Sequence, residues 1–195
     1  MNYLAHLALA RPTPASKVGN LLGDFMRGVR EDALPAPVRQ GLHNHRLVDR
    51  LTDQHPEVMA SRALFSSRRR RFAGVAMDVL FDHFLLRHWA HFHDTPLAQA
   101  VEGDYRLLQA GRPLMPEPMR RRMERMMAHD GLRYYHSLDN VGQALDRMAE
   151  GLRFANPFQG MVTELQTHYD ALEAVFLTLY PQLQAEVAVS GLEKD

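Results

Sequence analysis

Polar side chains interrupt an apolar segment near the start of the chain. Asn20 and Asp24 lie four residues apart among Leu21, Leu22 and Phe25, so both project from one face of a helix. A buried carboxylate is costly, and Asp24 needs a cation or hydrogen-bond donors if this face is buried. The alternative is an exposed stripe on an amphipathic helix.

A second segment, residues 41–53, combines a histidine with carboxylates at helical spacing. His45, Asp49 and Asp53 step by four residues, which places them on one helical face. A histidine and carboxylates in this arrangement can converge on one metal ion. The alternative is a solvated face with intrahelical ion pairs, such as Asp49 with Arg46 or Asp53 with Arg50.

The third segment, residues 76–89, is almost continuously apolar apart from its carboxylates and basic groups. Asp78 and Asp82 share a face, and His83 follows. A helix of this composition is buried on most sides. Two buried carboxylates on one face repel each other unless a metal ion or an arginine lies between them. The alternative to a metal is therefore a carboxylate–arginine network that uses Arg87 or another arginine.

Together the three segments indicate a divalent metal ion. Carboxylate oxygens with imidazole, in a chain without cysteine, suit Mn²⁺, Mg²⁺ or Fe²⁺ and also permit Zn²⁺. Such an ion polarises a phosphoryl oxygen and lowers the pKa of water, and arginine neutralises phosphate oxygens. The pattern favours hydrolysis at phosphorus.

The segments that must position these side chains all have helical periodicity. No segment shows sustained period-two alternation with turn pairs. We expect an all-α protein, a single-domain helical bundle over residues 1–195, with about eight to ten helices and with Pro181 kinking or dividing the last one. Caps, prolines and apolar spacing predict helices over residues 2–10, 16–30, 35–53, from 56, within 68–93, 96–110, 119–129, 137–153 and 157–189.

Composition excludes several classes of protein. With 46% hydrophobic and 24% charged side chains, the chain can bury a core and is not disordered. The absence of cysteine excludes a disulfide scaffold, an iron–sulfur cluster and a cysteine nucleophile. The 23 basic and 23 acidic side chains cancel, which argues against attraction of the whole molecule to nucleic acid. Residues 1–10 lack a signal-peptide pattern and no apolar run could span a bilayer, so we expect a cytoplasmic protein without membrane contact.

Longer motifs in the chain resemble those of one known family. They are MNYLAHL at 1–7, GNLLGDF at 19–25, HRLVDRLTD at 45–53, DVLFDHFLLRHW at 78–89 and HYDALE at 168–173, followed by Tyr180-Pro181. These motifs are similar, in order and over nearly the whole chain, to acyl carrier protein phosphodiesterases. The resemblance implies an Mn²⁺-dependent hydrolase that removes 4′-phosphopantetheine from holo-acyl carrier protein. It also implies an HD-phosphohydrolase-like fold, although Asp82 and His83 reverse the usual His-Asp order.

The residues and the resemblance together suggest roles in the site. His83 is the candidate proton donor to the leaving serine, Asp49 orients a ligand, and Arg46 and Arg87 contact phosphate oxygens. The candidate metal ligands are Asp24, His45, Asp78 and Asp82, with His83, Asp49 and His6 as second choices. The candidate substrate contacts are His6, Asn20, His168 and Tyr169, the last with a core role as the alternative.

Two arginine clusters could dock the partner. Acyl carrier proteins are acidic, so basic patches near the site would steer them. The alternative is a solvated helix face, and for the interleaved methionines it is plain core packing. The candidate partner-binding residues are Arg68, Arg69, Arg70, Arg71, Arg121, Arg122 and Arg125.

Two other functions compete with the carrier-protein hydrolase. An HD-like phosphohydrolase that acts on a nucleotide such as guanosine polyphosphate would have much the same site. A non-enzymatic helical module that binds nucleic acid through the arginines would show salt-sensitive affinity without metal, but it leaves the buried Asp and His residues unexplained.

Overall fold

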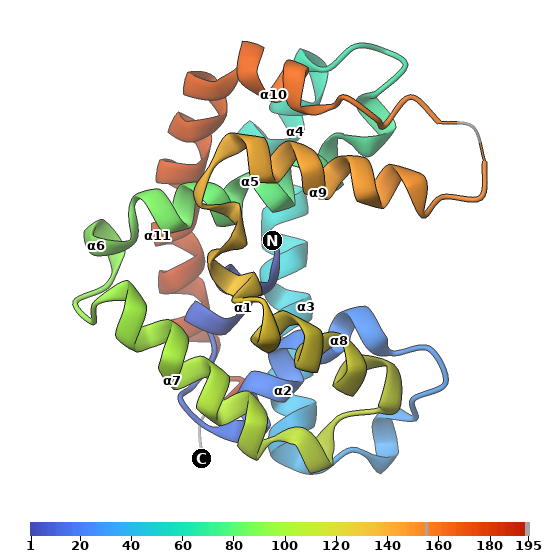
Figure 1. The fold of residues 1–195 in the computed structure, drawn as a ribbon. Helices are drawn as coiled ribbons and strands as arrows, with labels where there is room; N and C mark the ends of the chain where they lie inside the picture. The colour runs from blue at the N-terminus through green and yellow to red at the C-terminus, as the bar shows by residue number, and fades with distance from the viewer. Residues whose placement is uncertain (155, 194–195) are drawn as a thin grey trace.

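The structure, a computed structural model, describes residues 1–154 and 156–193. Over these residues it is all-helical, without a β-strand, which confirms the predicted all-α class. None of the described helices is long and apolar enough to cross a membrane. The helices (Figure 1) are α1 (Tyr3–Ala8), α2 (Pro14–Leu22), α3 (Ala36–Gln54), α4 (Pro56–Ser61), α5 (Ala73–Arg87), α6 (Trp89–Phe92), α7 (Leu97–Ala110), α8 (Glu117–Ala128), α9 (Leu138–Glu150), α10 (Val162–Thr167) and α11 (Tyr169–Ser190).

Helix α5 runs through the middle of the bundle. It contacts α1, α9 and α11, and its apolar side chains are buried on nearly every side. Phe81 and Phe84 both pack against Phe176 of α11, with ring centroids 5.8 Å apart in each pair. Burial of such rings is a main source of stability in a helical core. Helix α5 therefore provides a rigid frame for the short helix α1 beside it.

The start of α1 is held by a carboxylate from α5. The backbone amides of Leu4 and Ala5 donate to Asp82, at 2.9 and 3.0 Å. The first amides of a helix have no partner within the helix, and a negative charge at this end is favourable. Asp82 is 1% exposed, so it acts as a buried cap that fixes α1 against α5.

Helices α2 and α3 cross at very short distance. A Cβ atom on Gly19 would lie 2.3 Å from the carbonyl oxygen of Val38 and 2.8 Å from Cα of Gly41. Glycine at both positions is what allows the two backbones to approach. This contact brings the end of α2 next to the middle of α3, where the site lies.

Two predicted helices have wrong boundaries. The helix expected over 16–30 begins earlier, capped by the Thr13 side chain, and ends at Leu22, where a 3₁₀ turn, η1 (Gly23–Phe25), replaces it. The helix expected from 157 begins at Val162, after Gly160 with a φ of 71°, and restarts at Tyr169. A left-handed glycine does not continue a helix. Helix α11 runs through Pro181 without dividing.

Candidate active site

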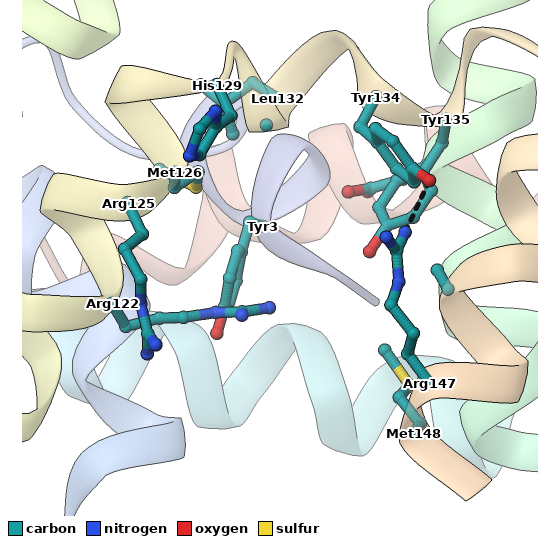
Figure 2. A pocket seen from close by; sticks show the side chains of 13 residues that line it. Tyr3, Arg122, Arg125, Met126, His129, Leu132, Tyr134, Tyr135, Arg147 and Met148 are labelled. Atoms are coloured by element: carbon teal, nitrogen blue, oxygen red, sulfur yellow. Dashed lines mark hydrogen bonds between the residues drawn. The ribbon is translucent and has the colours of Figure 1, made fainter. Parts of the chain in front are cut away.

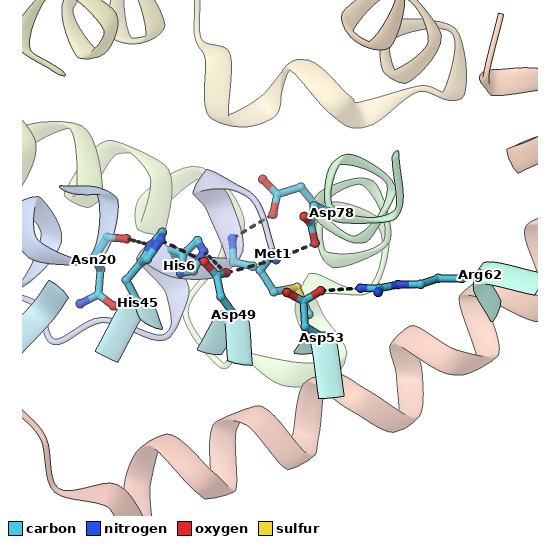
Figure 3. Close-up of polar contacts among 10 residues, drawn as sticks. Met1, His6, Asn20, His45, Asp49, Asp53, Arg62 and Asp78 are labelled. Carbon is cyan, nitrogen blue, oxygen red and sulfur yellow. Dashed lines mark hydrogen bonds and ion pairs between the residues drawn. The ribbon is translucent and has the colours of Figure 1, made fainter. Parts of the chain in front are cut away.

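Two histidines and a carboxylate from α1 and α3 converge beneath the N-terminal residue. The Nε2 atoms of His6 and His45 lie 3.1 and 3.0 Å from the two carboxylate oxygens of Asp49. The two imidazole rings stack with centroids 4.0 Å apart. Among the described residues, these three form the one group of histidine and carboxylate donors whose ligand atoms all lie within 4.8 Å (Figure 3). We call it the His6–His45–Asp49 group.

Local structure orients His45 within this group. His45 and Asp49 are four residues apart on α3, so they share a face. The Nδ1 of His45 lies 2.8 Å from the backbone carbonyl oxygen of Asn20, to which it donates, so that Nε2 faces Asp49. A Cβ atom on Gly23 would lie 2.0 Å from Nε2 of His45. Glycine after α2 is therefore needed for the imidazole to occupy this place.

The charges in the group are set by burial and by mutual contact. Burial opposes ionisation of Asp49, but the contacts with His45 and His6 outweigh it, so its pKa is well below the ordinary value. Burial lowers the pKa of His6 to about 4, against the opposing effect of Asp49. Burial also disfavours protonation of His45, yet Asp49 raises its pKa overall. The group thus holds an ionised carboxylate beside a neutral imidazole.

These residues fit a divalent metal ion. His6 is 1% exposed; among the described residues its Nδ1 has no hydrogen-bond partner, and its Nε2, although 3.1 Å from Asp49, forms no hydrogen bond of ordinary geometry. A buried polar atom without a partner is costly. Neutral imidazole and ionised carboxylate are the protonation states that metal binding requires. The donor set is His₂Asp, which suits Mn²⁺, Fe²⁺ or Zn²⁺.

The other predicted metal ligands lie around this group rather than in it. Asp78 is 2.7 Å from the α-ammonium group of Met1, which is also 3.6 Å from Asp49. Asp82 caps α1, and burial raises its pKa to about 7 although the Leu4 and Ala5 amides oppose the shift. Asp24, on η1, has its pKa raised by partial burial and by the charge of Asp49, against the effect of His45. Of these three carboxylates, Asp24 is the one whose pKa shift includes interactions with both His45 and Asp49.

His83 belongs to a different network. Its Nδ1 lies 2.7 Å from the carbonyl oxygen of Tyr135, and its Nε2 lies 2.7 Å from the hydroxyl of Tyr169. Arg87 donates to the same hydroxyl at 3.3 Å and pairs with Glu173 at 3.2 Å. Both ring nitrogens of His83 are thus engaged within the protein.

The remaining predicted site residues have varied surroundings. Arg46 points to solvent and pairs with Glu31 at 2.8 Å. Asn20 is fully buried; its amide donates to the Ser16 carbonyl, and it accepts from Asn44. His168 lies between α10 and α11, half-buried. Of these residues, Asn20 acts on the His6–His45–Asp49 group, through its backbone oxygen.

The two arginine clusters differ from one another. Arg69 donates to the carbonyl oxygens of Pro157 and Gln159 and pairs with Glu164, so it holds the segment before α10. Arg68, Arg70 and Arg71 are exposed. On α8, Met119, Met123 and Met126 are buried, as core packing predicts. The exposed arginines of α8 face outward or towards a neighbouring cavity.

The chain matches known proteins along most of its length. A family model described as acyl carrier protein phosphodiesterase matches residues 1–183. The chain belongs to this family. Proteins named acyl carrier protein phosphodiesterase from Escherichia coli O139:H28 (strain E24377A / ETEC) and Escherichia coli (strain K12 / DH10B) are each 36% identical over 193 residues, which is 98% of this chain and 100% of theirs. No solved structure matches the chain.

Membership of the acyl carrier protein phosphodiesterase family confirms the resemblance drawn from the motifs. Those motifs contain all three members of the His6–His45–Asp49 group. The motif at 19–25 also contains Gly23, which residue chemistry did not single out. Its close approach to His45 depends on how α2 packs against α3, which the sequence does not show. The only sequence feature that could have pointed to this position is the glycine itself.

Proposed function

We propose that this chain is a hydrolase that removes 4′-phosphopantetheine from holo-acyl carrier protein and gives apo-acyl carrier protein. The observation that carries the proposal is the family match over nearly the whole chain. The bond to be broken is the phosphodiester to the serine of the carrier. A buried group of metal-type donors within the matched residues supports this chemistry.

We place Mn²⁺ at the His6–His45–Asp49 group, with Asp24, whose charge interacts with His45 and Asp49, as a further carboxylate. When bound there, a divalent ion would polarise a phosphoryl oxygen and lower the pKa of water. The buried ring of His6, whose nitrogens form no hydrogen bond of ordinary geometry within the described residues, supports this placement. The carbonyl oxygen of Asn20 fixes the tautomer of His45, as an outer partner of a ligand does.

Other residues of the chain hold and complete this site. Asp82 fixes α1 and thereby His6, which lies in the same helix. Arg46 and Arg87 remain candidates for contact with phosphate oxygens, and His83 for protonation of the serine. A His-Asp group carried on helices is also what supports an HD-phosphohydrolase-like assignment. The proposed substrate is consistent with the predicted cytoplasmic location.

The metal assignment is tested by substituting ligands one at a time. We expect His45→Ala and Asp49→Asn to lose Mn²⁺ in equilibrium dialysis and to lose at least about 100-fold of holo-carrier cleavage, beyond the usual effect of an outer partner. The matched control is Asp53→Asn, because Asp53 lies one turn further along α3 and pairs with Arg62 at 2.6 Å instead. Retention of Mn²⁺ by both ligand variants would contradict the assignment.

A further inference from the structure

A cavity of about 550 Å³ lies between α8, α9 and the turn η6 (Gly131–His136). Its volume is in the range of small-molecule sites. Arg122 and Arg125 from α8 and Arg147 from α9 project from opposite sides, with Tyr3 of α1 between them (Figure 2). None of the residues that line the cavity belongs to the His6–His45–Asp49 group.

The arginines of this cavity lack acidic partners. Within the described part of the chain, no carboxylate forms an ion pair with Arg122, Arg125 or Arg147. Nearby arginines outside the cavity do have such partners: Arg121 pairs with Glu117 at 2.8 Å and Arg133 with Asp130 at 2.7 Å. Arg147 instead donates to the hydroxyl of Tyr134 and lies over its ring. Three uncompensated guanidinium groups around one cavity favour an anionic ligand.

The rest of the lining is apolar and aromatic. Met126, Leu132 and Met148 contribute aliphatic surface, and Tyr134 and Tyr135 contribute rings with polar ends. Methionine adapts to irregular, flexible ligands. A ligand that is complementary to both the arginines and the apolar lining is therefore anionic at one end and amphipathic along its length.

The cavity adjoins the candidate active site. Tyr3 and Asp82 line it, and Asp82 holds α1, the helix that carries His6. The guanidinium carbon of Arg122 lies 5.9 Å from the centre of the Tyr3 ring. Burial raises the pKa of Tyr3, and the charge of Asp24 raises it further. Tyr3 thus lies between Arg122 of the cavity and Asp24 of the candidate active site.

We propose that this cavity binds the 4′-phosphopantetheine arm of the substrate, an inference that rests on the proposed function. The arm carries a phosphate at one end, then a dimethyl-substituted carbon, two amides and a thiol. The arginines attract the phosphate end, and Met126, Met148 and the tyrosines receive the chain. Arg122 and Arg125, which the sequence predicts to dock the carrier, contact the prosthetic group in this proposal.

The test is calorimetric titration of the intact protein with free 4′-phosphopantetheine, pantetheine and inorganic phosphate. We expect 4′-phosphopantetheine to bind most tightly. Arg147→Ala should weaken it about tenfold, as loss of a charged hydrogen bond does, and should leave pantetheine unchanged. Ala144→Leu, which adds volume inside the cavity, should weaken both organic ligands. The controls are Arg106→Ala and Ala110→Leu on the exposed side of α7.

Unchanged binding of 4′-phosphopantetheine to both cavity variants would overturn the inference, as would equally tight binding of inorganic phosphate. Cleavage of holo-carrier by the unmodified protein is measured separately. If cleavage occurs and the cavity variants bind normally, the cavity assignment fails and the hydrolase stands. If binding depends on the cavity but no cleavage occurs, the cavity assignment stands and the hydrolase fails.

Discussion

His83 lies in α5 with both ring nitrogens engaged, one with the carbonyl oxygen of Tyr135 and one with the hydroxyl of Tyr169. It is 6% exposed. Burial lowers the pKa of its imidazole below 6.5, although the Tyr135 contact opposes the shift. The folded protein therefore favours the neutral ring.

This environment predicts a pH-dependent stability. The contribution of neutral His83 to the free energy of unfolding is fully present above 6.5, the pKa of histidine in the unfolded chain. It is lost as the pH falls from there towards the lower pKa of His83 in the folded protein. We expect His83→Gln to cost about 1 kcal/mol near neutral pH and to reduce the loss of stability between about pH 7 and pH 5. Urea unfolding at both pH values measures this.

His91→Gln, at an exposed position of α6, is the control for the effect of removing any histidine on the pH dependence of stability. It should keep the pH dependence of the unmodified protein. If His83→Gln and the unmodified protein lose stability in parallel as the pH falls, the neutral, hydrogen-bonded state of His83 is refuted.

Among the elements, the crossing of α2 and α3 decides where the site forms. A Cβ atom added to Gly19 would lie 2.3 Å from the backbone of α3, whereas a Cβ atom added to Gly103 in α7 would have no neighbouring atom within 4 Å. We expect Gly19→Ala to destabilise the protein by about 1–3 kcal/mol, because the helices must separate. Gly103→Ala should stabilise it by about 0.5–1 kcal/mol, because alanine is the better helix former. Urea unfolding of both variants compares them.

Because His45 and Asn20 meet across this crossing, Gly19→Ala should also weaken Mn²⁺ binding, and Gly103→Ala should not. Equal stability of the two alanine variants would mean that the close contact of α2 and α3 does not exist in solution.

Elements whose ends are set by local chemistry could be predicted from the sequence. A helix is predicted over 35–53 and is found at Ala36–Gln54, and the helix predicted from 137 is capped by the side chain of Ser137. The second helix could not be delimited, because its apolar spacing continues after Leu22 while the backbone must turn at Gly23 to clear His45. At the start of the helix predicted from 157, Asn156 accepts from the amide of Phe158, which makes a local turn rather than a helix start.

The candidate site was predictable to the extent that it lies on one helix. The spacing of His45 and Asp49 on α3 indicated a shared face, whereas His6 came from the resemblance alone. The sequence predicts a metal ligand at Asp82, because a buried carboxylate needs a partner. Its partners are the amides of Leu4 and Ala5, far away in sequence, and no local pattern reveals such a cap.

At the scale of the whole molecule, the net charge is zero, so attraction of an acidic carrier depends on local patches. Arg121 is a docking candidate on the exposed face of α8, while Arg69 is engaged with the segment before α10. We expect Arg121→Glu to raise the KM for holo-acyl carrier protein about two- to fivefold. The effect should shrink at high salt, and kcat should stay unchanged.

The small-substrate control separates docking from chemistry. A simple pantetheine phosphodiester lacks the acidic carrier, so Arg121→Glu should hydrolyse it at the normal rate. Arg106→Glu, on α7, tests whether a negative charge added anywhere on the surface raises the KM for the carrier. An equal loss on carrier and small diester would rule out docking by Arg121.

The most direct test of the proposed hydrolase is incubation of the pure, folded protein with holo-acyl carrier protein, with and without Mn²⁺, followed by intact mass measurement of the carrier. The expected result is that the carrier is converted to its apo mass, with release of 4′-phosphopantetheine, when Mn²⁺ is present and not when it is absent. An unchanged carrier mass with every divalent metal tried would contradict the proposal. Turnover of a guanosine polyphosphate by the same sample would then favour the nucleotide phosphohydrolase.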